Sequence, residues 1–576
     1  MGPVRRVLVA TFLCAAPLSA APAYASGDLL SRTALRQALR QSAGASSRSA
    51  IPLPLPERPR ASAAAAGELG SIARSKGRVQ VLVGVRAHAA LPAVAGRLRR
   101  LGARPRPFHT IGVLAAAVPS GAAVARALGA DPRVAYIERD RRLELAIDPF
   151  DTVDAPWGSG IKYTWAFDAV RATDAIAAAG GGSDRTVAVI DTGLDLSHPE
   201  FAGRVARTYD TAYGDGEVTD EIGHGTFVSG LIAAIDGNGI GGKGVAGATR
   251  VIAVRASRDG GFTVGELIAG IDFAIRNGAR VINMSLAGED FTVSQARALE
   301  AAFLNDVLPV AASGNEGQRN NPLGFPAAAV GGRRGGKGIG LSVSATRPDG
   351  SWADFSSHND YVSLAAPGAG SSGCEFGVFS TLPATYSTAW DSFDSCSRVY
   401  TQGGARFAYG EGTSFSAPIA AGIAALAWQV EPRLASEQVA EVLVRSASQT
   451  VGSGWNEFTG AGVVDGAAAA ALARSYDVSA PSPRGRARRR GPGAVGVRVT
   501  RTRDRTEPGR ELAGRVRYGL LVSRDGGQRY SVAVGQRRRP FRKRLRLSGR
   551  RANVLVATAC DGNGNCALKR LGRFYK

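Results

Sequence analysis

Gly412-Thr413-Ser414-Phe415-Ser416-Ala417-Pro418 places a serine between a glycine and an apolar run that continues to Val430. Thr413 suits a helix cap, and proline is tolerated in a first helical turn, so the pattern predicts a helix that opens at the serine. The positive end of such a helix favours negative charge that develops beside it. The stretch therefore predicts that Ser414 is a nucleophile.

Two earlier motifs supply the partners that such a serine needs. Residues 187–193, Val-Ala-Val-Ile-Asp-Thr-Gly, end an apolar strand on Asp191, and residues 223–226, Gly-His-Gly-Thr, set His224 at the start of another apolar run. Serine attacks a carbonyl only when a base removes its proton. His224 is the predicted base, and Asp191 is predicted to orient the imidazole. Asp, His, Ser is one of the chain orders in which this triad occurs.

A fourth motif offers a donor for the oxyanion that forms during acyl transfer. Residues 310–317, Val-Ala-Ala-Ser-Gly-Asn-Glu-Gly, place the amide of Asn315 on a glycine-bounded turn after a strand. An amide donates a hydrogen bond without carrying charge, and the Ser414 backbone N–H is the expected second donor.

The middle of the chain alternates short apolar strands with longer helical runs such as 264–277 and 293–305. This alternation predicts an α/β fold with a parallel sheet flanked by helices, in which functional residues gather at the carboxyl ends of strands. The expected strands are 186–190, 250–255, 281–284, 308–312, 339–344 and 361–365.

These four motifs together resemble the hallmark segments of the subtilisin-like serine proteases (subtilases, peptidase family S8). Residues 281–286 resemble the family's substrate-binding strand and residues 460–465 its closing segment. The resemblance implies a serine endopeptidase that needs no cofactor for its chemistry, with structural calcium at a site that these residues do not place and no metal ligands in the catalytic site. It also implies substrate-binding residues, namely Ser285, Leu286, Ala287, Ala312, Ser313 and Gly314.

Some positions depart from the family pattern. Phe227 stands where many subtilases carry a second histidine, Phe415-Ser416-Ala417 replaces Met-Ala-Ser, and Leu286-Ala287-Gly288 replaces Leu-Gly-Gly. None of these changes touches the triad, and the last two are expected to alter pocket shape.

The chain organisation predicts export and processing. Residues 1–25 are typical of a signal peptide, with Arg5 and Arg6 before a short apolar core; a membrane-anchoring helix is the alternative. We predict a disordered spacer over 26–76, a β-α-β-β-α-β unit over 77–146, the catalytic domain over 147–475, a basic linker over 476–494 and a small all-β domain over 495–576. The resemblance implies that the α+β unit over 77–146 is an inhibitory propeptide that is removed autocatalytically, with the cleavage expected between residues 142 and 155.

Four cysteines remain after a signal peptide would be removed. They form two sequence-local pairs, so we expect disulfides Cys374–Cys396 and Cys560–Cys566 in an exported protein. No apolar stretch near 20 residues lies outside the N-terminus, so no transmembrane anchor is expected.

Charge divides the chain into three parts. The net charge of +23 combines 22 Lys+Arg and 8 Asp+Glu in residues 1–150, 22 and 34 in residues 151–475, and 27 and 5 in residues 478–576. The basic C-terminal part has three open interpretations: it binds an anionic cell-surface polymer, it docks on the acidic catalytic domain, or it is a solvated module rich in arginine.

Two further motifs resemble sites that their spacing does not support. Residues 237–243 nearly spell a phosphate-binding loop, but Gly244 takes the Ser/Thr position and a helix precedes. Residues 561–565 imitate a calcium loop, but Cys566 replaces its glycine.

The sequence therefore predicts a secreted serine endopeptidase, extracellular or cell-wall associated, that is made as an autoprocessed zymogen and acts on proteins or peptides. Two alternatives remain: a narrowly specific surface maturation protease, and a non-catalytic cationic surface-binding protein on a protease scaffold.

Overall fold

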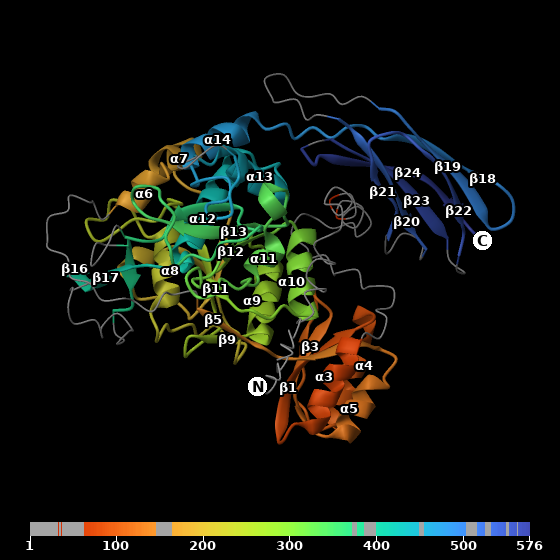
Figure 1. The fold of residues 1–576 in the computed structure, drawn as a ribbon, viewed down its shortest axis with the longest axis horizontal. Coiled ribbons are helices and arrows are strands. Elements are labelled where there is room, and N and C mark those ends of the chain that lie inside the picture. Colours follow the sequence, from red (N-terminus) through yellow and green to blue (C-terminus); the bar gives the residue numbers. More distant parts are fainter. Residues whose placement is uncertain are drawn as a thin grey trace, which may run out of the picture.

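The computed structural model describes residues 33, 36, 63–145, 164–370, 377–384, 399–448, 454–502, 515–524, 531–548, 552–561 and 563–576. A central α/β domain carries an α+β domain on one side and a β domain at the end of the chain (Figure 1). The predicted fold class is confirmed.

The central sheet has seven strands in the order β14-β13-β12-β10-β6-β8-β7, and all neighbouring strands in it pair in parallel. Most of its strands are buried along their whole length, because helices cover both faces. The strands are β6 (Val187–Asp191), β7 (Val205–Asp210), β8 (Val251–Arg255), β10 (Val281–Met284), β12 (Leu308–Ala312), β13 (Leu341–Thr346) and β14 (Leu364–Pro367).

Six of these strands confirm the sequence prediction within a few residues. The prediction missed β7, an edge strand of sequence Val-Ala-Arg-Thr-Tyr-Asp that is only partly buried. An edge strand needs no continuous apolar run, so its sequence does not differ from that of a loop.

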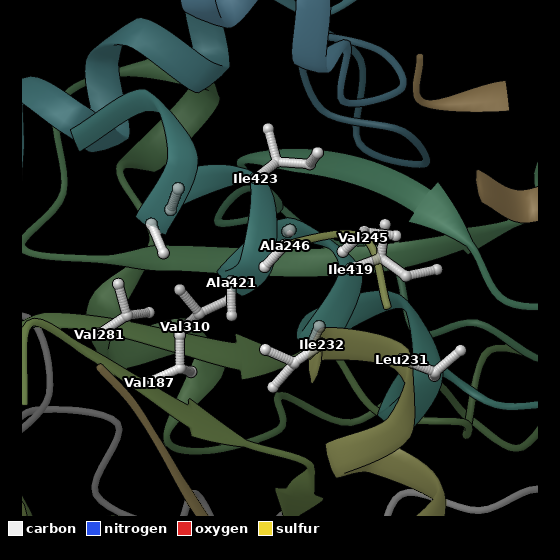
Figure 2. Packing of buried hydrophobic residues seen from close by; sticks show 14 of the residues in the cluster. Val187, Leu231, Ile232, Val245, Ala246, Val281, Val310, Ile419, Ala421 and Ile423 are labelled. Atoms are coloured by element: carbon white, nitrogen blue, oxygen red, sulfur yellow. The ribbon is translucent and has the colours of Figure 1, made fainter. Parts of the chain in front are cut away.

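Helix α12 (Thr413–Val430) runs through the core. Its small side chains let the sheet and neighbouring helices approach closely, and Ile419, Ala421 and Ile423 pack among residues of β6, β10, β12 and α8 (Figure 2). Among the described residues, α12 is also the one helix with the length and hydropathy of a membrane span, yet 89% of it is buried inside the protein.

The other helices of this domain are α6 (Trp165–Ala169), α7 (Ala172–Ala178), η2 (Pro199–Phe201), α8 (His224–Ala233), α9 (Val264–Arg276), α10 (Val293–Leu304), α11 (Ala327–Val330), η3 (Arg333–Gly335), α13 (Ser436–Ser446) and α14 (Gly466–Ser475). Capping boxes start α9 at Thr263 and Glu266 and α10 at Thr292 and Gln295. Two small antiparallel sheets complete the domain: β15 (Val378–Leu382), β16 (Val399–Gln402) and β17 (Ala405–Gly410), and the sheet of β5 (Arg142–Leu145), β9 (Gly261–Thr263) and β11 (Leu286–Ala287).

The N-terminal α+β domain has its own apolar core and the predicted β-α-β-β-α-β order. Its sheet runs β2-β3-β1-β4. The elements are α3 (Ala63–Arg74), β1 (Arg78–Val85), η1 (His88–Ala90), α4 (Leu91–Arg100), β2 (Arg106–Phe108), β3 (Val113–Pro119), α5 (Ala122–Gly129) and β4 (Val134–Arg139).

Helix α3 lies inside the range where the sequence predicted a disordered spacer, so that prediction is wrong for residues 63–74. The alanine-rich composition suggested low complexity, but Leu69 and Ile72 lie on one helical face and join the core of this domain. We call residues 26–146, which comprise the predicted spacer and the predicted propeptide, the prosegment. The signal-peptide prediction lies outside the described residues.

The C-terminal domain packs two antiparallel sheets around one core, as predicted. Its strands are β18 (Arg484–Arg489), β19 (Ala494–Thr500), β20 (Arg517–Ser523), β21 (Ser531–Arg537), β22 (Arg542–Arg546), β23 (Asn553–Cys560) and β24 (Cys566–Phe574). The sequence assigned β18 to the linker and predicted no strand at β22 or β24. Strands β18 and β22 are rich in arginine, and β24 is an edge strand that is only partly buried.

The tip of the β23–β24 hairpin joins the C-terminal domain to the central α/β domain. Cys560 and Cys566 form a disulfide there, and Gln438 of α13 donates to the Asn563 carbonyl and the Asn565 side chain. The predicted partners Cys374 and Cys396 lie outside the described residues.

Candidate active site

Asp191 and His224 form a direct pair in the core. Asp191 is the last residue of β6 and His224 is the first of α8, so the carboxyl end of a strand meets the start of a helix. His224 Nδ1 lies 2.6 Å from Asp191 Oδ1, and both side chains are buried. This contact fixes the imidazole with Nε2 turned away from the carboxylate.

Gly225 permits the close approach of α8 to β6. A Cβ at this position would lie 2.2 Å from the Gly193 carbonyl oxygen and 3.2 Å from the Asp191 Cβ. Any side chain would push the helix away from the strand and break the Asp191–His224 contact. The glycine that follows His224 is therefore a packing requirement of the pair.

Ser414 lies in the first turn of α12, beside this pair. The ring of Phe415, the next residue, lies 5.6 Å from the ring of His224 between centroids. The Ser414 hydroxyl donates to the Ser285 carbonyl at 3.1 Å in this structure, not to His224. His224 Nε2 is buried without a hydrogen-bond partner among the described residues, so it can accept the serine proton after a rotation about the Ser414 side chain.

Asn315 is held next to Ser414 by its carbonyl end. Asn315 Oδ1 accepts hydrogen bonds from the Thr413 backbone N–H at 3.0 Å and from the Thr413 hydroxyl at 2.9 Å. These bonds orient the amide, so its NH₂ group points away from Thr413. The Ser414 backbone N–H, in the first turn of a helix, has no intrahelical acceptor, so both expected oxyanion donors lie at this helix start.

Asp220, which the sequence motifs did not indicate, is a buried carboxylate that organises the loop before His224. It accepts hydrogen bonds from Thr192 Oγ1 and from the backbone N–H groups of Ile222, Gly223 and Thr226. Thr192 in turn accepts from the Gly225 backbone N–H, which links the loop to the residue after Asp191. No local pattern indicates this role, because Asp220 lies three residues before the N-cap residue Gly223 and not at the capping position itself.

The predicted substrate-binding residues fall into two groups. Leu286 and Ala287 form β11, which pairs antiparallel with β5, and Ser285 contacts Ser414 directly. In contrast, the N–H groups of Ser313 and Gly314 bond to Val343 and Thr413 inside the domain, and Ala312 belongs to β12. Residues 312–314 therefore form their hydrogen bonds within the central domain and do not pair with β5.

Strand β9 pairs with β5 on the side opposite β11, and it was not predicted from the sequence. Arg142, Leu143 and Glu144 pair with Thr263, Phe262 and Gly261. An extended segment thus lies between β9 and β11, with antiparallel pairing on both sides. This is the geometry by which a sheet edge binds a peptide chain.

The comparisons with known proteins agree with this geometry. Residues 182–462 match the model of the subtilase family. A thermophilic serine proteinase of Bacillus sp. strain AK1 is 32% identical to the chain over 325 residues, which cover 55% of this chain and 70% of that protein. The chain belongs to the subtilase family.

Two further relatives are similar over most of their own lengths. Subtilisin DY of Bacillus licheniformis is 30% identical over 50% of this chain and 92% of its own length. Subtilisin E of Bacillus subtilis strain 168 is 30% identical over 62% of this chain and 81% of its own length. This subtilase is therefore a serine endopeptidase, and its substrates are proteins or peptides.

The described residues of the subtilase hold no cluster of three or more His, Cys, Asp or Glu that could bind a metal. One buried carboxylate, that of Glu200, is hydrogen-bonded at only one of its two oxygens within the described part of the chain. It is buried, its Oε1 has no hydrogen-bond partner among the described residues, and its Oε2 accepts from Asn238. Burial raises the pKa of Glu200 to about 7. One carboxylate oxygen falls short of the six to eight oxygens that calcium takes, so structural calcium stays a prediction.

Proposed function

We propose that Asp191, His224 and Ser414 are the catalytic triad of a secreted endopeptidase that is made as an autoprocessed zymogen. The observation that carries the proposal is the buried 2.6 Å contact between His224 and Asp191 beside the start of α12. A histidine oriented by a carboxylate next to a serine at a helix N-terminus is the arrangement that acyl transfer needs.

The mechanism follows from these positions. Ser414 Oγ attacks the peptide carbonyl carbon while His224 Nε2 takes its proton, and Asp191 stabilises the imidazolium that forms. The Asn315 amide and the Ser414 N–H donate to the oxyanion. His224 then gives the proton to the leaving amine, which produces an acyl-enzyme. A water molecule, deprotonated by His224, hydrolyses the ester and restores Ser414.

The position of β5 supports the zymogen proposal. The strand runs antiparallel to β11, with Glu144 opposite Ala287 and Leu145 opposite Leu286, so its direction leads towards Ser285 and the nucleophile. Strand β5 of the prosegment thus lies along β11 as a bound peptide substrate would. We place the cleavage shortly after Leu145, inside the range 142–155 predicted from the sequence.

Two carboxylates at the end of the prosegment also support docking. Glu138 accepts from the N–H groups of Val293 and Ser294 at the start of α10, and Asp140 accepts from Gly265 at the start of α9. Carboxyl oxygens at helix N-termini accept from backbone N–H groups that have no partner within the helix. Secretion rests on the N-terminal signal pattern of residues 1–25.

The test is expression of the full chain with and without Ser414→Ala. We expect the wild type to lose residues up to the junction after Leu145 and to hydrolyse casein, and the variant to do neither. Processing and hydrolysis by purified Ser414→Ala would refute the assignment. Cleavage of the junction but not of casein would favour the narrowly specific maturation protease, and loss of both in the wild type would favour the non-catalytic alternative.

A second candidate function rests on an arginine face of the C-terminal domain. In the sheet β18-β19-β22, Arg486 lies opposite Arg498, and Arg498 lies opposite Arg542. The face also carries Arg484, Arg488, Arg544 and Arg546, all exposed and without an ion-pair partner among the described residues. Like charges opposite one another destabilise a sheet, so such rows suit a ligand that neutralises them.

We propose that this face binds an anionic surface polymer and holds the enzyme at the cell wall. Long-chain polyphosphate is a soluble probe. The triple variant Arg486→Gln, Arg498→Gln, Arg542→Gln should bind it at least about tenfold more weakly at low salt and with a smaller salt dependence. The control changes the exposed arginines 537–539 to glutamine; equal binding by both triple variants would refute the role of the face.

A further inference from the structure

Arg36 lies in a pocket of the catalytic domain, although the sequence places it in the predicted spacer. Its side chain is only 4% exposed. The guanidinium donates to Asp306 Oδ1 at 3.1 Å, to Ser436 Oγ at 3.2 Å and to Glu437 Oε1 at 2.8 Å. It also donates to the Phe303 carbonyl at 3.2 Å and lies 4.9 Å from the centroid of the Phe303 ring.

These groups match a guanidinium and not a general cation. A guanidinium is planar, with donors around its edge and a face that stacks on aromatic rings. The pocket offers two carboxylates, a hydroxyl and a carbonyl to the edge, and a phenyl ring to the face. Thr33 adds a second contact from the same segment, because its hydroxyl donates to Glu437 Oε1 at 2.6 Å.

The pocket is formed where two helices meet. Phe303 lies in the last turn of α10, and Ser436 and Glu437 start α13. The last carbonyls of a helix carry partial negative charge, so a cation is stabilised at the end of α10. Asp306 joins the helices: it accepts from the Ser436 N–H at 2.8 Å and pairs with Arg280 at 3.0 Å.

The prosegment therefore contacts both ends of α10 with charges of opposite sign. Glu138 accepts from the first N–H groups of this helix, and Arg36 donates to the carbonyl of Phe303 in its last turn. Twelve residues span about 18 Å. Figure 1 shows α10 with one end towards the α+β domain and the other towards α13. The two contacts are thus separate sites on the catalytic domain.

We propose that Phe303, Asp306, Ser436 and Glu437 form an arginine-binding pocket whose ligand is Arg36, and that this pocket is a second anchor of the prosegment. Two linked contacts raise the effective concentration of each for its site, so a cleaved prosegment stays bound longer than the α+β domain alone would. The consequence for activation rests on the proposed zymogen function, whereas the pocket itself does not.

The first test uses the full chain with Ser414→Ala, so that no processing occurs. Hydrogen exchange is measured in peptides that cover residues 303–306 and 435–438. We expect Arg36→Ala to speed exchange there about tenfold, and Arg36→Lys to have a smaller effect because it keeps the charge without the planar donor fork. Arg100→Ala, which removes an exposed arginine of the prosegment, is the control.

A double variant sharpens this test. In a Glu437→Gln background, Arg36→Ala should change exchange much less than it does alone, because the strongest partner of the guanidinium is already gone. Exchange in Arg36→Ala equal to that in Arg100→Ala, or fully independent effects of the two substitutions, would overturn the pocket.

The second test follows activation of the processing-competent chain on a chromogenic peptide. Arg36→Ala should shorten the delay between cleavage of the junction and full activity several-fold, and Arg100→Ala should leave it unchanged. Equal delays would overturn the anchoring role. A chain without any peptidase activity would refute the proposed function instead, and the exchange experiment would still decide the pocket.

Discussion

Replacement of Asp220 by alanine should loosen the loop that carries His224. Asp220 is fully buried, and its carboxylate accepts from four donors in the structure. A buried donor left without a partner costs about 1–3 kcal/mol, so the three buried donors, Thr192 Oγ1 and the N–H groups of Gly223 and Thr226, give a loss of at least ~3 kcal/mol in the free energy of unfolding. With about 2 °C per kcal/mol in a large domain, the unfolding midpoint should fall by roughly 6 °C or more.

The same change should lower activity through geometry. Asp220 does not contact the pair of Asp191 and His224 directly, but it fixes Thr192 and the start of α8 on either side of it. A displacement of a catalytic group by about 1 Å can cost ~10²-fold in rate. We therefore expect kcat on a peptide substrate to fall by about 10- to 100-fold, with little change in KM.

Thermal unfolding of the Ser414→Ala chain and steady-state kinetics of the active chain measure the two effects. The control is Glu221→Gln, which removes a neighbouring exposed negative charge. Asp220→Asn should be intermediate, because one amide oxygen still accepts while the NH₂ group faces a former donor. An Asp220→Ala enzyme with the midpoint and kcat of the Glu221→Gln control would refute the reasoning.

Three further predictions concern the oxyanion, the prosegment and the C-terminal domain. Asn315→Ala should lower kcat by roughly 10²–10³-fold with KM nearly unchanged, as steady-state kinetics would show; an unchanged kcat would remove Asn315 from the oxyanion site. Burial raises the pKa of Asp140 to about 6 and also raises the pKa of Glu138, so the docked prosegment binds protons that the free prosegment releases. Protonation of these carboxyl groups therefore stabilises the docked prosegment at low pH, and this stabilisation is lost as pH rises through about 6. Prosegment dissociation should be faster at pH 7.5 than at pH 5, and it should depend less on pH in Asp140→Asn. Asn565→Ala, which removes a contact to Gln438, should speed proteolysis between the catalytic and C-terminal domains, measured by limited digestion; an unchanged rate would contradict hairpin docking.

The sheet and the catalytic motifs could be predicted because their signals are local. Buried parallel strands appear as continuous apolar runs, and a strand that ends on Asp191 or a helix that starts at Ser414 is visible in a few residues. Strands β7, β18 and β22 were missed because exposed edges and arginine-rich faces carry no such run. Their strand state depends on pairing with a distant partner.

The sequence by itself predicted the reaction chemistry of this protein from the order of Asp191, His224 and Ser414, the amide of Asn315 and the α/β alternation that brings them to one sheet edge. Only the tertiary structure revealed which distant groups complete the site. In the structure, Asp220 hydrogen-bonds to the loop before His224, β5 lies between β9 and β11, and Arg36 is buried between α10 and α13. Each of these contacts joins residues far apart in the chain or depends on burial. A buried charge needs a partner, but the residues next to it in the sequence do not show which partner that will be.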